Sequence, residues 1–189
     1  MGKVNITTRE QNLLLEEFRK DPFLSSNFYF TGGTALSLYY LKHRKSEDLD
    51  FFSVNEFDPL LVSERVEDWA KKLKFKIEYS PREITHSFLL TFKNKKSVKV
   101  DFSHYPHRQL DKINNIDGIK VDSIFDIAVN KLLVIEQRTA VKDFVDFYFL
   151  LKKYTVWDLI ESVRTKFGVK LDPFIIASDF FKVETFDYM

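Results

Sequence analysis

Three aspartates are the residues of this chain best suited to phosphoryl-transfer chemistry. Asp48 and Asp50 are two residues apart at a predicted strand, Leu49–Ser53, so their side chains point to one face about 6–7 Å apart. Asp101 lies on the polar side of a second predicted strand, Ser97–Ser103, whose residues alternate. Three carboxylates that converge from two adjacent strands can hold two Mg²⁺ ions, which activate an attacking oxygen and stabilise a leaving one.

A pair of glycines precedes the acids. Gly32 and Gly33 follow the aromatic segment Phe28–Thr31, which predicts a strand, and lead into an apolar run that predicts a helix from Thr34. Backbone N–H groups at such a junction can approach an anion closely. Thr34 can cap the helix, bind a phosphate oxygen, or both. The turn has neither the lysine of a P-loop nor a G-x-G-x-x-G pattern, so a simple tight turn stays an alternative.

Charged residues also fall within predicted helices of the C-terminal third. Lys131 shares a stripe with apolar residues of a helix capped by Ser123. Its ammonium either reaches solvent along the side-chain stem or supplies a point charge to a triphosphate. Asp143 and Asp146 share one helix face downstream of Arg138, and a role in ion pairs or capping is the simpler interpretation.

The composition limits the classes of protein to consider. With 189 residues, 44% hydrophobic and 30% charged, the chain can build one sizeable core or a domain with a helical appendage. The net charge of +1 does not indicate a nucleic-acid binder. The chain has no cysteine, which excludes disulfides and thiolate chemistry and fits a reducing cytoplasm. No apolar run approaches the roughly 20 residues that span a bilayer, so we expect a soluble cytoplasmic protein without a membrane partner.

The pattern of elements predicts an α/β part over residues 1–121 and a helical part over residues 122–189, packed on the first. A first helix from about Thr8 to Lys20 is predicted to begin with a capping box of Thr7 and Glu10. The further predicted elements are helices at about Thr34–Leu41, Pro59–Leu73, Ser123–Ile135, Lys142–Leu151 and Thr155–Phe167 and one opened by Asp172-Pro173, with strands at Phe75–Tyr79 and His86–Phe92.

Two stretches together resemble a known family. The segment Gly32–Phe52 is similar to the first motif of nucleotidyltransferases of the AbiEii/AbiGii toxin group, a Gly-Gly or Gly-Ser turn, a helix, and Arg-x-Ser-x-Asp-hydrophobic-Asp. The last part of that motif is Arg44–Asp50 in this chain. The stretch Asn130–Leu151 is similar to the helical motifs of the group, whose lysine, arginine and Lys-Asp-x-x-Asp match Lys131, Arg138, Lys142, Asp143 and Asp146.

The resemblance implies an α+β fold with a polymerase-β-like nucleotidyltransferase core, a mixed sheet with flanking helices, and a helical C-terminal part. It also implies transfer of a nucleoside monophosphate from an NTP to an acceptor, with release of pyrophosphate. Members of the group act as toxins in toxin–antitoxin or phage-defence systems. The acceptor would be RNA, such as tRNA, or protein, and a cognate antitoxin could exist.

The leading hypothesis is therefore a Mg²⁺-dependent nucleotidyltransferase that uses two ions, with Mn²⁺ as a substitute. Asp48 and Asp50 would bind both metals, while Asp101 would complete the inner metal and help to deprotonate the acceptor hydroxyl. Lys131 would offset phosphate charge, and Asp143 would orient Lys131 or contact the nucleotide or acceptor. The residues expected to hold the β- and γ-phosphates are Gly32, Gly33, Thr34 and Ser46.

Two other classes of function stay open at this point. The chain could be a non-catalytic module that binds nucleotide or a partner protein on the same fold. A phosphatase of the haloacid-dehalogenase type also carries an Asp-x-Asp, but its first Asp ends the opening strand and Thr or Val follows the pair. Here Phe51 follows the pair, and a glycine turn and a helix precede it.

Overall fold

The computed structural model describes residues 6–186, which divide into two compact units. The first unit contains the residues up to Pro106 together with Ile113–Asp122, and the second contains His107–Lys112 and the residues from Ser123 onward. The division into 1–121 and 122–189, with the second part packed on the first, stays a prediction. Residues 1–5 and 187–189, which this prediction includes, lie outside the part of the chain that the structure describes.

Within the described residues, the first unit is built on a seven-stranded mixed sheet with the order β3-β4-β5-β2-β1-β7-β6. Strand β1 runs parallel to β7, and β2 runs parallel to β5, while the other pairs are antiparallel. The strands are β1 (Tyr29–Thr31), β2 (Leu49–Ser53), β3 (Lys76–Pro81), β4 (Thr85–Thr91), β5 (Ser97–His104), β6 (Asn114–Ile116) and β7 (Ile119–Val121). The predicted strands at residues 28–31, 49–53, 75–79, 86–92 and 97–103 are all present, with small shifts at their ends.

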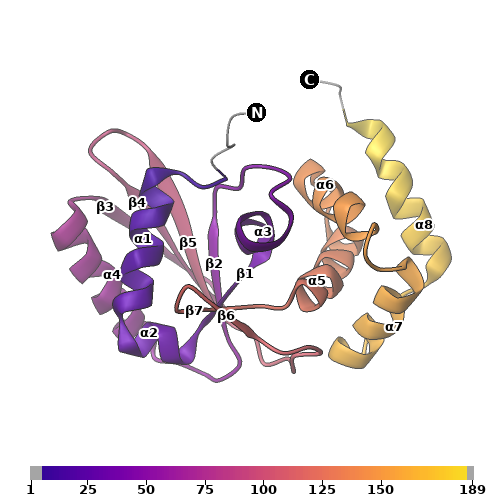
Figure 1. Ribbon diagram of the computed structural model, residues 1–189, viewed down its shortest axis with the longest axis horizontal. Helices are drawn as coiled ribbons and strands as arrows, with labels where there is room; N and C mark the ends of the chain where they lie inside the picture. Colours follow the sequence, from indigo (N-terminus) through magenta and orange to yellow (C-terminus); the bar gives the residue numbers. More distant parts are fainter. Residues whose placement is uncertain (1–5, 187–189) are drawn as a thin grey trace. The chain divides into compact units, whose positions relative to one another are not determined.

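An aromatic core fixes one face of this sheet. Phe51 of β2 stacks on Phe18 at 4.0 Å between ring centroids and on Phe102 of β5 at 5.2 Å, and all three are fully buried. Figure 1 shows the helices on this side of the sheet, which are α1 (Arg9–Lys20), α2 (Pro22–Asn27) and α4 (Pro59–Leu73). Because side chains alternate along a strand, the residues next to Phe51 and Phe102 must point to the opposite face.

The segment after β1 lies on that opposite face (Figure 1). Helix α3 (Gly32–Ala35) continues directly as a π-helical turn over Leu36–Leu41, which ends at Lys42 with a left-handed φ of 54°. The predicted helix Thr34–Leu41 therefore begins two residues earlier and changes its hydrogen-bond pattern midway. Short π-helical segments are rare and are frequent at functional sites.

Other departures from the predicted elements are local. The capping box of the first helix uses Thr8 and Gln11, so the prediction of Thr7 and Glu10 is wrong by one residue. Helix α2 was not predicted, and neither was the hairpin of β6 and β7. The hairpin turns at Asp117 and Gly118, whose φ values of 53° and 80° are typical of a two-residue turn.

The second unit is helical. Helix α5 (Ile124–Gln137) contacts each of the three helices that follow it, which are α6 (Val141–Leu150), α7 (Val156–Phe167) and α8 (Pro173–Phe181). The predicted caps Ser123 and Thr155 accept hydrogen bonds from the first turns of α5 and α7. None of the helices among residues 6–186 is long and apolar enough to cross a membrane.

Candidate active site

A row of polar side chains crosses the centre of the sheet on the face opposite Phe51. Asp50 of β2 and Asp101 of β5 are Cα partners across two parallel strands, so the structure places these two predicted site residues side by side. Thr31 of β1 is the partner of Asp50 on its other side, and Ser87 of β4 is the partner of Asp101. The register of four strands therefore sets two carboxylates between two hydroxyl groups.

Asp101 is the more deeply placed of the two acids, with 9% of its surface exposed. Its Oδ1 is buried and has no hydrogen-bond partner among residues 6–186, whereas its Oδ2 lies 2.5 Å from Nζ of Lys99. Leaving a buried carboxylate oxygen without a partner costs free energy, so such an atom in a native fold points to a ligand or a catalytic role. A cation or a proton at Oδ1 would remove this cost.

The backbone of Gly32 lies against the carboxylate of Asp50. A Cβ atom at Gly32 would collide with Oδ2 of Asp50, and the φ of Gly32 is +74°. Both constraints select glycine, the first because of close approach and the second because the left-handed region disfavours other residues. Gly32 is thus more than a turn residue, since it brings the main chain beside the central acid.

The side chains that lie against Gly33 differ from those that lie against Gly32. A Cβ atom there would lie 2.6 Å from Nη2 of Arg44 and 3.2 Å from Oγ of Ser46. The glycine therefore leaves room for a guanidinium group and a hydroxyl group, both of which can donate hydrogen bonds to phosphate oxygens. Ser46 was among the predicted phosphate-binding residues. Arg44 was noted only as part of the motif, and this contact is the first sign of a role for its side chain.

Two buried side chains hold the loop that leads to the acids. Thr34 is fully buried, and its Oγ1 donates a hydrogen bond to the carbonyl of Asp48 at 2.5 Å. Nε2 of Gln11 donates to the carbonyls of Ser46 and Glu47 at 2.8 and 3.1 Å. Thr34 thus acts on the site through Asp48, and its direct contact with a phosphate stays a prediction. Gln11 could not be assigned a role from sequence, because its partners are backbone groups 35 and 36 residues away.

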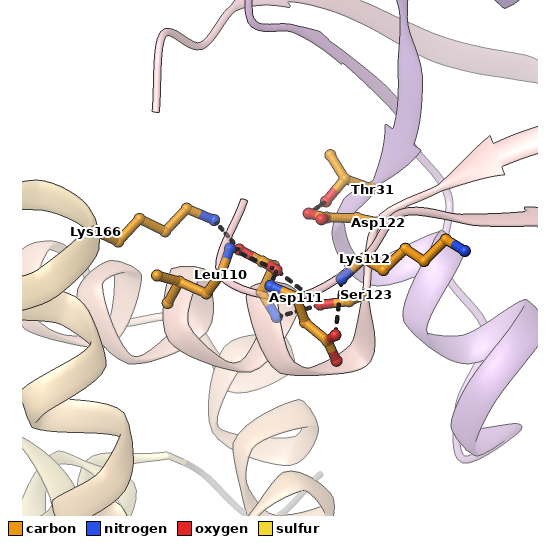
Figure 2. Close-up of polar contacts among 8 residues, drawn as sticks. Thr31, Leu110, Asp111, Lys112, Asp122, Ser123 and Lys166 are labelled. Atoms are coloured by element: carbon orange, nitrogen blue, oxygen red, sulfur yellow. Dashed lines mark hydrogen bonds and ion pairs between the residues drawn. The ribbon is translucent and has the colours of Figure 1, made fainter. Parts of the chain in front are cut away.

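The structure adds a third carboxylate to the row. Asp122 follows β7 and is fully buried, and Thr31 Oγ1 donates to its Oδ2 at 2.8 Å. Figure 2 shows these two side chains directed toward one another. The hydroxyl of Tyr40, in the π-helical turn, donates to the carbonyl of Asp122 at 2.7 Å. Sequence reasoning missed Asp122 because the three-residue strand before it is too short to show a period.

A metal site can be tested against this geometry. Asp50 and Asp101 offer adjacent hard oxygen ligands, and the unpartnered Oδ1 of Asp101 fits a divalent cation. Among residues 6–186, however, no group of three or more His, Cys, Asp or Glu side chains is arranged to hold a metal ion. Convergence of Asp48 with the other two acids therefore stays a prediction.

In the second unit, Lys131 lies between two buried acids. Its Nζ is 2.7 Å from Oδ1 of Asp143 and 2.7 Å from Oδ2 of Asp146, while Arg138 contacts Asp143 at 2.9 Å. Burial raises the pKa of Asp143, but Arg138 and Lys131 outweigh burial and hold that pKa below its usual range. Lys131 is 8% exposed, so its stem does not carry the ammonium into solvent. The predicted contact of Lys131 with a triphosphate stays a prediction.

A second buried ion pair organises the same unit. Nζ of Lys166 lies 2.7 Å from Oδ1 of Asp126, and both side chains are fully buried. The backbone N–H groups of Leu110 and Asp111 and the hydroxyl of Ser123 also donate to the Asp126 carboxylate. Figure 2 shows Lys166, Leu110, Asp111 and Ser123 gathered around this point. Burial raises the pKa of Asp126, but these donors outweigh it and lower the pKa below its ordinary value.

Comparison with solved structures defines the class of fold. A candidate nucleotidyltransferase from H. pylori superposes with a TM-score of 0.63 at 22% identity, covering 96% of this chain and 86% of that one. MenT4, a nucleotidyltransferase toxin from Mycobacterium tuberculosis H37Rv, gives a TM-score of 0.54 at 15% identity, covering 82% and 60%. The mixed sheet with flanking helices is thus a nucleotidyltransferase fold, as predicted.

The sequence itself gives the family. Residues 13–184 match the family described as nucleotidyl transferase AbiEii toxin, Type IV TA system, and the chain belongs to this family. A protein of Aquifex aeolicus (strain VF5), aq_aa25, is 36% identical over an alignment of 142 residues, and the alignment covers 73% of this chain and 64% of that protein. The chain thus spans somewhat less than two thirds of the length of this relative. The predicted resemblance is confirmed.

The close approach of Gly32 to Asp50 gives a first prediction. Gly32→Ala should lower the free energy of unfolding by about 1–3 kcal/mol through backbone strain, and by more because the new methyl group must displace Asp50. Gly118→Ala is the matched control, because Gly118 has a similar φ of +80° but its Cβ would meet only Arg19 side-chain carbons, at 3.2 Å and beyond. Urea denaturation compares the two variants. Equal losses would mean that Asp50 does not constrain Gly32.

The Asp126 ion pair gives a second prediction, on pH. A folded-state pKa below the unfolded value of about 3.9 stabilises the protein above that pH, and this contribution is lost as pH falls through the folded pKa. Asp126→Asn should therefore cost about 3–5 kcal/mol at pH 7, because it leaves Lys166 buried without its partner, and the cost should shrink toward acid. Denaturation between pH 7 and pH 2.5 measures both effects.

The control for that experiment is Asp68→Asn, because Asp68 pairs with Lys71 on the exposed side of α4. Solvent and salt screen such a pair, so its pH profile should stay close to that of the wild type. An Asp126→Asn cost that is independent of pH would contradict the assignment.

Proposed function

We propose that the chain is a Mg²⁺-dependent nucleotidyltransferase, which transfers a nucleoside monophosphate from an NTP to an acceptor and releases pyrophosphate. The observation that carries the proposal is the pairing of Asp50 with Asp101 across β2 and β5, with Oδ1 of Asp101 buried and without a partner in the described part of the chain. Membership of the AbiEii family supports it, since that family is described as nucleotidyl transferases.

The acids would share the work of holding metal and moving a proton. Asp48, Asp50 and Asp101 would hold the ions, Mg²⁺ or Mn²⁺, and bound divalent ions would offset phosphate charge and activate the acceptor hydroxyl. Asp101 would also help to deprotonate that hydroxyl. Thr34 would keep Asp48 in place through the carbonyl contact.

The phosphate groups would lie along the glycine turn. Gly32 and Gly33 offer a main chain without side chains in the way, and Ser46 and Arg44 lie against Gly33. An arginine guanidinium suits phosphate oxygens because its donors are planar and always charged. On the family motif, we propose that Lys131 offsets phosphate charge and that Asp143, which contacts it, orients it.

The proposal also covers the acceptor and the biological role. We propose RNA, such as tRNA, or protein as the acceptor, and a toxin role with a cognate antitoxin, acting in the cytoplasm. The family description names a Type IV toxin–antitoxin system, and MenT4 of the same fold is named as a nucleotidyltransferase toxin. Both descriptions support a toxin without identifying the acceptor.

A non-catalytic binding module is the second candidate. It is favoured by one observation, that no three-acid metal group is formed among residues 6–186. Calorimetry with each NTP, with and without Mg²⁺, followed by a pyrophosphate-release assay on cellular RNA, separates the two candidates. The phosphatase alternative lacks support, because the opening strand β1 ends at Thr31 and Asp48 precedes the next strand.

The decisive variant for catalysis is Asp50→Asn. It keeps the shape of the side chain beside Gly32 and removes its charge, so label transfer from an α-labelled NTP to RNA or protein should fall by roughly 10²–10³-fold or more. The melting temperature should stay the same or rise, because repulsion among the clustered carboxylates decreases. Asp68→Asn, an exposed acid on α4, is the matched control and should keep full activity. Undiminished transfer by Asp50→Asn would refute the metal assignment.

A further inference from the structure

A lysine already occupies one oxygen of the proposed catalytic acid. Lys99 and Asp101 are two residues apart on β5 and therefore point to the same face of the sheet. Nζ of Lys99 lies 2.5 Å from Oδ2 of Asp101, and the contact is both an ion pair and a hydrogen bond. The alternation along the strand places both residues on its polar side, but it does not indicate that they touch.

The two partners differ in how firmly the fold holds them. The Asp101 side chain is 13% exposed, whereas the Lys99 side chain is 45% exposed. The acid is therefore fixed within the sheet, while the ammonium group can turn into solvent at the cost of one contact. The neighbour of Lys99 on β4 is Leu89, which offers no carboxylate.

The carboxylate of Asp101 cannot bind the Lys99 ammonium and a divalent ion together without a large cost in free energy. A metal ion bound to Asp101 would lie within a few ångströms of Nζ if Lys99 kept its place, and like charges at that distance repel strongly in a partly buried site. Without either cation, both oxygens of a carboxylate that is largely buried would lack a partner. Asp101 thus needs one cation at a time.

We propose that Lys99 is a displaceable counter-ion, which neutralises Asp101 in the metal-free protein and leaves when a divalent cation binds. In this role Lys99 weakens metal binding and sets the cation concentration at which the site fills. Lys99 is a positioning residue, because it acts through Asp101 and does not contact the reacting groups. The inference rests on the proposed function, since it assumes that Asp101 is a metal ligand.

The test measures metal binding without turnover. The full-length protein and its Lys99→Met variant are titrated with Mn²⁺ by calorimetry, and their melting temperatures are recorded with and without Mn²⁺. Methionine keeps most of the length of the side chain and removes its charge. Lys99→Met should bind Mn²⁺ roughly three- to fivefold more tightly, the range expected from losing an ion pair that is partly exposed. Its metal-free melting temperature should be lower than that of the wild type, and its rise with Mn²⁺ should be larger.

Lys76→Met is the matched control. Lys76 lies on the same face of the sheet two strands away, on β3, and is exposed, so its removal changes net charge equally without touching Asp101. It should bind Mn²⁺ as the wild type does. Asp101→Asn should lose binding, which would show that the titration reports this site.

The outcomes separate the two claims. Equal or weaker Mn²⁺ binding by Lys99→Met, with wild-type binding that depends on Asp101, would overturn the role of Lys99 and leave the proposed function standing. A wild type that binds no Mn²⁺, or binds it independently of Asp101, would refute the metal assignment and the inference together.

Discussion

The in-register pairing of β2 with β5 is the constraint on which the candidate site depends. It sets Phe51 beside Phe102 and, one residue earlier on each strand, Asp50 beside Asp101. Because side chains alternate, the contact that buries the aromatic rings under α1 also presents the acids on the other face. A slip by one residue would bury a carboxylate in the core and expose a phenylalanine, so the hydrophobic free energy of the core keeps Asp50 and Asp101 side by side on the other face.

Three buried acids each have partners that offset the cost of burying their charge. Asp122 accepts a hydrogen bond from the hydroxyl of Thr31. Asp126 forms an ion pair with Lys166 and accepts hydrogen bonds from two backbone N–H groups. Asp143 forms ion pairs with Lys131 and Arg138. Asp101 differs from these three acids, because one of its oxygens has an exposed lysine and the other has no partner among residues 6–186, an arrangement that Asp179 shares with Lys182. A site that must exchange cations needs a group whose charge is incompletely satisfied, whereas structural ion pairs need the opposite.

Much of the fold could be predicted from the sequence, because elements with a clear hydrophobic period can be recognised from their own residues. Strand Leu49–Ser53 and helix Pro59–Leu73 match their predicted bounds, and the alternation in Ser97–Ser103 correctly assigned the faces of β5. What escaped prediction depends on tertiary contacts. The hairpin before Asp122 is too short to show a period, and Gln11 acts on backbone carbonyls. The pairing of Asp126 with Lys166, 40 residues apart, has no local signal either. The sequence pattern predicted that the three acids lie close together, but only the strand register shows which two are adjacent.

We propose that Asp50 and Asp101 together hold a metal ion, and that the NTP binds beside it at the glycine turn. A crystal structure with a non-hydrolysable NTP and Mn²⁺ tests this arrangement, because anomalous scattering locates the metal. We expect an anomalous peak beside Asp50 and Asp101, the triphosphate against Gly32 and Gly33, and the Lys99 ammonium turned away from Asp101. Nucleotide bound elsewhere, or a metal that contacts neither acid, would contradict it.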